Sequence, residues 1–93
     1  MGREVAVFYT AHARKDLLKI DAVHVRAIVH KIEENTALED PLSRAKLLSG
    51  ALAGLYRYRV GEYRVIFETN DQGTVYVLTI LRVKHRKDVY RSM

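Results

Sequence analysis

Three arginines in one short stretch are the residues of this chain best suited to chemistry on a phosphate. Residues 55–69 read LYRYRVGEYRVIFET, and the Gly-Glu pair in this stretch suits a two-residue hairpin turn. Side chains in a hairpin alternate between faces, so Arg57, Arg59 and Arg64 are predicted to share one face. Arg59 would lie opposite Arg64, and like charges in that position destabilise a sheet. Either a polyanion binds the arginines, or their stems cover apolar surface on a solvated face.

The opposite face of this hairpin is aromatic and apolar. Tyr56, Tyr58, Tyr63 and Phe67 alternate with the arginines along the two strands. Burial of each such side chain beneath helices contributes roughly 1.5–3 kcal/mol or more. We therefore predict that these aromatic residues belong to the hydrophobic core, with platforms for stacked bases as the alternative, and that the arginines are left on the open face of the sheet.

The C-terminal segment holds a second cluster of reactive side chains. Residues 84–91 read KHRKDVYR and combine four cations with one imidazole and one phenol. This segment would leave the end of a central strand close to the arginines of the hairpin. An unstructured basic tail is the alternative interpretation.

The two clusters suit different chemical roles. A guanidinium has a pKa above about 12, so it is a poor base near neutral pH. Its forked donors instead match the oxygens of a phosphate. A free imidazole titrates near pH 6.5, about where a general base must work. We hypothesise that proton transfer falls to His85 or Tyr90, with Arg86 on the phosphate.

The charge of the chain is unevenly distributed. Its 93 residues carry a net charge of +5 with a pI near 9.7. Residues 1–50 contribute +1 and residues 51–93 contribute +4, so the excess lies with the arginines. This asymmetry indicates a nucleic acid or an acidic protein as partner.

Composition excludes several classes of protein. The chain has no cysteine, so disulfides and thiolate chemistry are absent and a reducing cytoplasm is the expected location. We find no signal-peptide pattern and no apolar run long enough to span a membrane, so no membrane partner is expected. The length fits one domain, 1–93.

Sites of other kinds are not indicated. His12, His24 and His30 fall on predicted helices without the spacing of a metal-ligand pair, so we expect no metal and no cofactor. There is no glycine-rich phosphate loop and no nucleophile elbow. The acidic run Glu33, Glu34, Glu39 and Asp40 is best explained as a solvated helix face, with a hydrolytic role as the minor alternative.

The elements that would position these residues follow from periodicity and caps. Thr10 suits the N-cap of a first helix, Asp21 suits that of a second, and Pro41 would end the second helix. The connection 41–53 has room for a short helical turn. Strands are expected at 4–10, 54–60, 63–69 and 74–83, and helices at 11–20 and 22–38.

This order of elements predicts an α+β fold in two layers. The N-terminal strand and a helical hairpin would pack on one face of a mostly antiparallel four-stranded sheet. Both faces of the strand at 74–83 are largely apolar, which is typical of a central strand.

The C-terminal half resembles a known family. YRYRVGEYRVIF at 56–67, followed by HRKDVY at 85–90, is similar to the RelE/ParE toxin superfamily, most of all to the RelE-type toxins of prokaryotic toxin–antitoxin pairs. The length and element order of the whole chain also fit that superfamily. The resemblance implies the RelE/ParE-like fold.

The resemblance also implies an activity and partners. The chain would be a metal-independent endoribonuclease that enters the ribosomal A site and cleaves messenger RNA, and an acidic antitoxin would neutralise it. Its own oligomeric state is left open. Lys84 stands where many members have glycine, and two arginines stand where many have lysines. By motif position the active-site residues are Arg57, Arg59, Arg64, Arg86 and Tyr90, joined by His85 from the argument above. The remaining cations of the region, predicted to contact RNA, are Arg82, Lys84, Lys87 and Arg91.

Two other functions remain open. ParE-type relatives share the fold but inhibit DNA gyrase and lack the full set of basic residues and tyrosine. An inactive module that binds RNA or antitoxin is the other alternative. Intact messages with accumulating DNA breaks would indicate the first, and unaffected growth with RNA binding would indicate the second.

Overall fold

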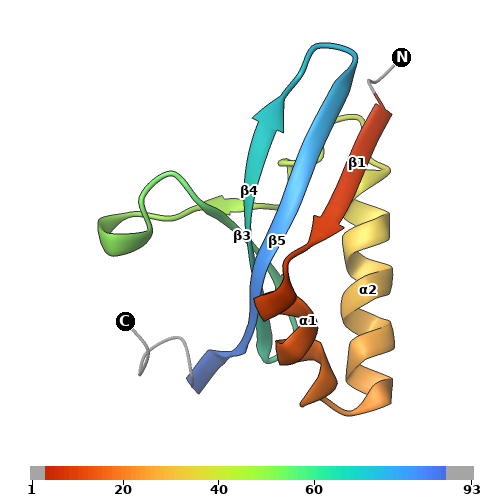
Figure 1. The fold of residues 1–93 in the computed structure, drawn as a ribbon, viewed down its shortest axis with the longest axis vertical. Coiled ribbons are helices and arrows are strands. Elements are labelled where there is room, and N and C mark those ends of the chain that lie inside the picture. The colour runs from red at the N-terminus through yellow and green to blue at the C-terminus, as the bar shows by residue number, and fades with distance from the viewer. Residues whose placement is uncertain (1–3, 88–93) are drawn as a thin grey trace.

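A computed structural model describes residues 4–87 of the chain. Five strands form one sheet in the order β1-β5-β4-β3-β2, in which β1 is parallel to β5 and every other pair is antiparallel (Figure 1). In chain order the elements are β1 (Glu4–Tyr9), α1 (Ala11–Leu18), α2 (Ala22–Thr36), β2 (Lys46–Leu47), the 3-10 helix η1 (Gly50–Leu52), β3 (Tyr56–Val60), β4 (Tyr63–Asp71) and β5 (Val75–His85).

The predicted α+β fold is confirmed, with one correction to the sheet. The sheet has five strands instead of four, because Lys46–Leu47 pairs with β3 inside the predicted connection 41–53. The helical turn expected in that connection is η1. Helix α2 ends at Thr36, earlier than the predicted residue 38, and the Thr36 hydroxyl donates to the carbonyl oxygen of Ile32 at 2.8 Å. Neither helix of the described residues is long and apolar enough to cross a membrane.

The residue between β1 and α1 joins three elements. The Oγ1 of Thr10 accepts a hydrogen bond from the backbone N–H of Ala13 at 3.1 Å, as an N-cap does. The same hydroxyl donates to the carbonyl oxygen of Leu81 at 3.0 Å, and the Thr10 N–H donates to that of Ile80 at 3.0 Å. Helix α1 therefore starts where β1 stops pairing and continues along the edge of β5.

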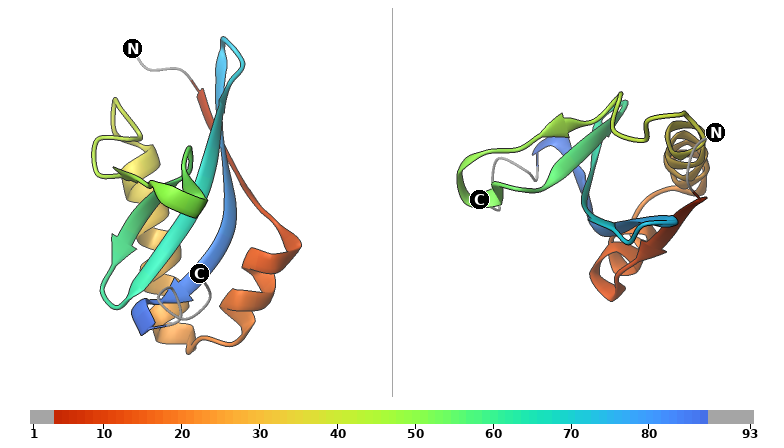
Figure 2. Two further views of the ribbon diagram at one scale, coloured as in Figure 1. Left: turned by 90° about the vertical axis from the view of Figure 1, so that its left-hand side faces the viewer. Right: turned by 90° about the horizontal axis from the view of Figure 1, so that it is seen from above.

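The core lies between the sheet and the helices, with α2 crossing one face of the sheet and α1 contributing the buried Ala13 (Figure 2). Tyr58 and Phe67 are fully buried, while Tyr56 and Tyr63 are partly buried against the core, as the alternation predicted. The Tyr58 hydroxyl donates to the carbonyl oxygen of Pro41 at 2.6 Å. The buried core cluster consists of Ala13, Ile28, Ile32, Tyr58, Val65, Phe67, Leu78, Ile80 and Val83.

A β-bulge in β5 changes which residues face the core. Ile66 pairs with Arg82 and Phe67 pairs with Ile80, so Leu81 is an extra residue in β5. On the N-terminal side of the bulge, even-numbered residues such as Ile80 face the core. On its C-terminal side, odd-numbered residues such as Val83 face the core. The two halves of β5 thus follow opposite alternations, and the lower half turns Arg82 to the other face.

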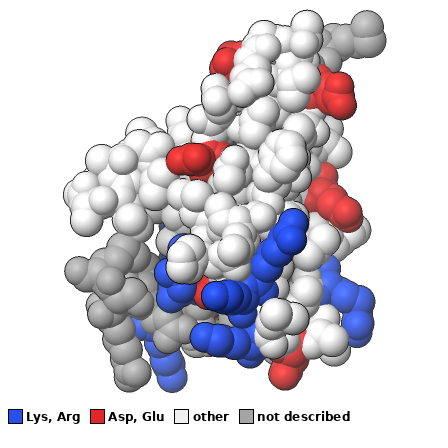
Figure 3. Space-filling view, in the orientation of Figure 1, with Lys and Arg blue, Asp and Glu red and all other residues white. Residues whose placement is uncertain are grey.

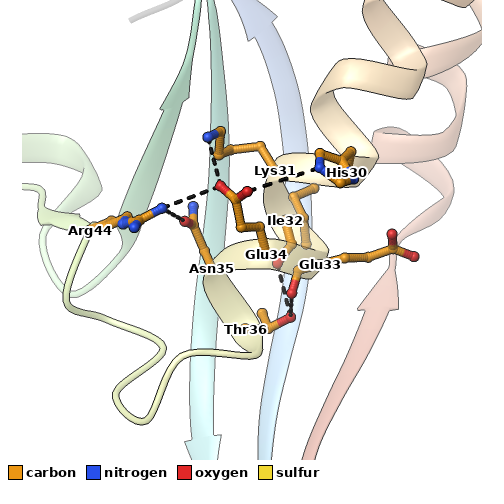
Figure 4. Close-up of polar contacts among 8 residues, drawn as sticks. All are labelled: His30, Lys31, Ile32, Glu33, Glu34, Asn35, Thr36 and Arg44. Atoms are coloured by element: carbon orange, nitrogen blue, oxygen red, sulfur yellow. Dashed lines mark hydrogen bonds and ion pairs between the residues drawn. The ribbon is translucent and has the colours of Figure 1, made fainter.

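The connection after α2 is tied to the helix by a polar cluster (Figure 4). Glu34 accepts from Lys31 Nζ at 2.7 Å and from Arg44 Nη1 at 3.3 Å. The same Nη1 lies 3.5 Å from Oδ1 of Asn35, a polar side chain that is buried in the described part of the chain. These contacts hold Arg44 beside α2, two residues before β2 begins at Lys46.

Candidate nucleic-acid interface

The hairpin of β3 and β4 has the predicted register. Arg59 pairs with Arg64 and Arg57 pairs with Ile66, so the three arginines share one face. Gly61 has a φ of 58°, in the left-handed region that the first position of a Gly-X turn requires. The face opposite α2 therefore carries the arginines, as predicted.

Neighbouring strands extend this face with further cations. Lys84 of β5 pairs with Arg64, which gives a row of three cations across the sheet. Lys46 of β2 pairs with Arg57, and nothing in the sequence indicated that position, because a two-residue strand has no alternation. Lys and Arg side chains gather over the lower half of the molecule in the view of Figure 3. We call this surface the basic face; its residues are Lys46, Arg57, Arg59, Arg64, Arg82 and Lys84.

Burial differs among the residues of the basic face. Lys46 and Arg59 are exposed, and neither forms an ion pair with a carboxylate of residues 4–87. Arg64 is partly buried, with its Nη1 covered by neighbouring atoms. Ile66 is only 5% exposed although it lies outside the core cluster. The arginine side chains therefore flank covered apolar surface and also present charge to solvent.

Arg82 is held by a carboxylate from α1. Its Nε donates to Asp16 Oδ2 at 2.9 Å and its Nη2 donates to Asp16 Oδ1 at 3.1 Å. The backbone N–H of Val83 donates to the same Oδ2 at 2.9 Å. Partial burial alone would raise the pKa of Asp16, but these hydrogen bonds and the positive charge of Arg82 hold it below its usual value. The predicted RNA contact Arg82 is thus already engaged in a two-point ion pair.

His85 lies on the other side of the sheet from Arg64. It pairs with Tyr63, and the two rings meet edge to face with centroids 5.3 Å apart. Its Nδ1 accepts a hydrogen bond from the backbone N–H of Lys87 at 3.3 Å. The structure therefore does not bring this histidine onto the basic face, although it places it at the end of β5 beside Lys84.

The residues after β5 are only partly described. Arg86 Nη1 lies 3.5 Å from Glu62 Oε1, and the Arg86 N–H donates to the Glu62 carbonyl oxygen at 2.7 Å. Lys87 is exposed. Tyr90 and Arg91, predicted as an active-site residue and an RNA contact, lie outside the described residues. Among residues 4–87, no three His, Asp or Glu side chains gather as metal ligands would.

Comparison with known proteins finds similarity along nearly the whole chain. A family model described as ParE toxin of type II toxin–antitoxin system, parDE, matches residues 7–90. The chain is 39% identical over 85 residues to Toxin RelG of Mycobacterium tuberculosis, covering 91% of this chain and 94% of that protein.

Solved structures share the fold. The toxin–antitoxin complex RelBE2 from Mycobacterium tuberculosis includes a chain with a TM-score of 0.75 and 34% identity, covering 90% of this chain and 93% of that one. The archaeal RelE–RelB complex from Pyrococcus horikoshii gives a TM-score of 0.65 and 28% identity, covering 92% and 97%.

Proposed function

Because this chain belongs to the RelE/ParE superfamily of toxins from type II toxin–antitoxin systems, we propose that it is an endoribonuclease that cleaves messenger RNA at the ribosomal A site. The observation that carries the proposal is the basic face. Arg59, Arg64 and Lys84 form one row of cations across three strands, on the side of the sheet that α2 does not cover.

This row of cations would stabilise the reacting phosphate most strongly at the transition state. In metal-independent cleavage the 2′-oxygen of the ribose bonds to the adjacent phosphorus and the 5′-oxygen leaves. The phosphate gains negative charge as this happens. Forked guanidinium donors fixed on strands are suited to stabilise that charge, and each such donor contributes about 10²–10³ in rate.

Proton transfer is assigned to the end of β5 and the residues that follow. His85 and Tyr90 remain the two candidates, and Arg86 is assigned to the phosphate. Since the ring of His85 contacts Tyr63 on the far side of the sheet from Arg64, a base role for His85 requires the RNA to bend around the end of β5. Single-turnover cleavage by His85→Ala within about threefold of wild type would remove the histidine from the mechanism.

The proposal includes an acidic antitoxin as partner. Two similar structures were solved as toxin–antitoxin complexes. The net charge of +5, of which residues 51–93 contribute +4, would attract an acidic chain. We expect this antitoxin to cover the basic face and to relieve toxicity on co-expression.

The decisive experiment maps the 5′ ends of cellular messages after induction of the protein. New ends within translated codons are expected for wild type. Arg64→Gln should lower cleavage about 10²–10³-fold. Arg26→Gln, an exposed arginine of α2, is the matched control and should cleave normally. Intact messages after induction of folded wild type would contradict the proposal, and EDTA in a purified assay would test its metal independence.

A gyrase-directed toxin is the second candidate, because the matching family model is described as a ParE toxin. Under this alternative, induction produces double-strand DNA breaks while messages stay intact. The same induced culture can be assayed for both products, so one experiment separates the two functions.

A further inference from the structure

We propose that a pocket beside the lower end of β5 binds a phosphate of an RNA nucleotide next to the cleavage site, with Lys19 as one of its ligands. The pocket has a volume of about 230 Å³ and lies between α1 and β5. This inference rests on the proposed function, since it takes RNA as the ligand of the basic face. The lining residues that matter are Asp16, Lys19, Tyr63, Arg82, Lys84 and His85.

The pocket continues the row of cations on the basic face. Lys84 belongs to both, because it pairs with Arg64 in the sheet and also lines the pocket. Neighbouring strands are about 4.8 Å apart, so the row from Arg59 to Lys84 spans roughly 10 Å. Tyr63 and His85 line the pocket from the other side of the sheet, so an RNA backbone that follows this row must turn around the edge of β5 beyond Lys84 to enter the pocket.

The charge of the pocket favours an anion. Its one carboxylate, Asp16, already accepts hydrogen bonds from Arg82 and from the Val83 N–H. Lys84 also attracts this carboxylate, but the three cations Lys19, Arg82 and Lys84 outnumber the single negative charge of Asp16, so the lining keeps a net positive charge. Lys19 is exposed and forms no ion pair with any residue of the described range 4–87. A phosphate is the complement of such a pair of ammonium groups.

The fold holds Lys19 where this role requires it. Asp16 fixes α1 to β5 through the Val83 N–H, and Lys19 follows three residues later as the C-cap of the helix. Its backbone N–H donates to the carbonyl oxygens of Asp16 and Leu17. The contacts that join α1 to the edge of β5 thus also fix the backbone of this lysine in the lining of the pocket.

The size and lining of the pocket fit one unit of a chain. Pockets that enclose whole small molecules measure about 300–1,000 Å³, which exceeds the volume here. The rings of Tyr63 and His85 line the same pocket and meet edge to face. Aromatic rings beside cations are the usual surface for single-stranded RNA, in which bases stack while phosphates bind lysine.

The test measures binding of a 2′-O-methyl RNA oligonucleotide, which lacks the attacking hydroxyl and cannot be cleaved. Lys19→Gln is expected to weaken binding about three- to tenfold at low salt and to reduce the slope of log K against log salt by about 0.7, the value for one phosphate of a single strand. Lys15→Gln is the matched control, because it removes the same charge from α1 but does not line the pocket. Melting temperatures of both variants establish that they fold.

Arg64→Gln is measured beside them to separate the two proposals. Weaker binding in both Lys19→Gln and Arg64→Gln, with Lys15→Gln unchanged, supports the pocket. Weaker binding in Arg64→Gln alone overturns the pocket and leaves the proposed function standing. Unchanged binding in both overturns both. Equal losses of RNA affinity in Lys19→Gln and Lys15→Gln would also overturn the pocket.

Discussion

At the residue scale, the pairing of Arg59 with Arg64 sets function against stability. Like charges directly opposite each other on a sheet repel, and the repulsion amounts to roughly 0.2–1 kcal/mol. Arg59 is exposed and has no ion-pair partner within residues 4–87 to offset that repulsion. A bound phosphate would reverse the sign of this interaction.

Arg59→Gln should therefore lower cleavage without lowering stability. We expect the free energy of unfolding to stay the same or rise by up to about 1 kcal/mol, while single-turnover RNA cleavage falls at least tenfold. Urea denaturation and cleavage of one RNA substrate measure the two quantities on the same sample. A stability loss above about 1 kcal/mol would show that Arg59 has a structural role instead.

Tyr58 is expected to show the opposite pattern. Tyr58→Phe leaves the Pro41 carbonyl without its 2.6 Å hydrogen bond in the core, so the free energy of unfolding should fall by about 1–2 kcal/mol while RNA binding is unchanged. Burial raises the pKa of Tyr58. The contribution of Tyr58 to the free energy of unfolding is therefore complete below about pH 10, the pKa in the unfolded chain, and declines as the pH rises above that value. Denaturation at pH 7 and pH 11 tests this, and an equal loss for the variant at both would contradict it.

At the element scale, α1 acts as a cover for the part of β5 that β1 does not reach. The pairing of β1 with β5 ends at Tyr9 and Ile80, and beyond it the Val83 N–H is satisfied by Asp16. An exposed edge strand is a site for unwanted pairing between chains, and a helix over the edge prevents it. The carboxylate of Asp16 therefore both satisfies the edge of β5 and holds Arg82 in position.

Asp16→Asn should destabilise the protein in a pH-dependent way. We expect a loss of about 2–3 kcal/mol at pH 7, because charge-assisted hydrogen bonds to Arg82 and Val83 weaken. The pKa of Asp16 is lowered by folding, so its stabilisation is complete above the unfolded value of about 3.9 and is lost as the pH falls through the folded value. The difference between variant and wild type should therefore shrink at low pH.

Urea denaturation of both proteins at pH 7 and pH 3 measures this difference. Asp21→Asn is the control, since the side chain of Asp21 is 87% exposed and makes no capping hydrogen bond. Its effect should stay below about 0.5 kcal/mol at both pH values. A loss in Asp16→Asn that is the same at both would contradict the assignment.

Turn residues and strand alternation predicted those parts of the fold that depend only on residues close together in the sequence. The register of β3 with β4 follows from one glycine turn and strict alternation, so the shared face of Arg57, Arg59 and Arg64 was predictable. The ion pair of Asp16 with Arg82 joins residues 66 positions apart, and no spacing rule connects them. The side of the sheet taken by His85 depends on where alternation restarts after the extra residue in β5, which periodicity alone does not locate.

At the scale of the whole molecule, the cations of the sheet gather on one of its two sides. The basic face occupies the side of the sheet away from α2, and α2 carries Glu34 in its own cluster with Lys31 and Arg44 (Figures 3 and 4). An acidic antitoxin and RNA would be drawn to the same surface. Under the proposed function, the two ligands therefore compete.

We expect the antitoxin to displace the uncleavable oligonucleotide completely at a one-to-one ratio. Fluorescence anisotropy of labelled RNA measures the displacement. Arg59→Gln should weaken the binding of both RNA and antitoxin. The loss of affinity should be smaller at higher salt, because salt screens the attraction. Arg26→Gln on α2 should affect neither. A stable ternary complex of protein, antitoxin and RNA would contradict a shared surface.

The extra residue Leu81 divides β5 into two halves whose side chains have separate roles. Before Leu81, the even-numbered side chains of β5 pack into the interior. After it, the even-numbered side chains lie on the surface that would contact the ligand. Deleting Leu81 would shift the phase of everything beyond it by half a period, turning Lys84 inward and Val83 outward. Shortening the strand by one residue should thus be far more damaging than truncating that leucine to alanine.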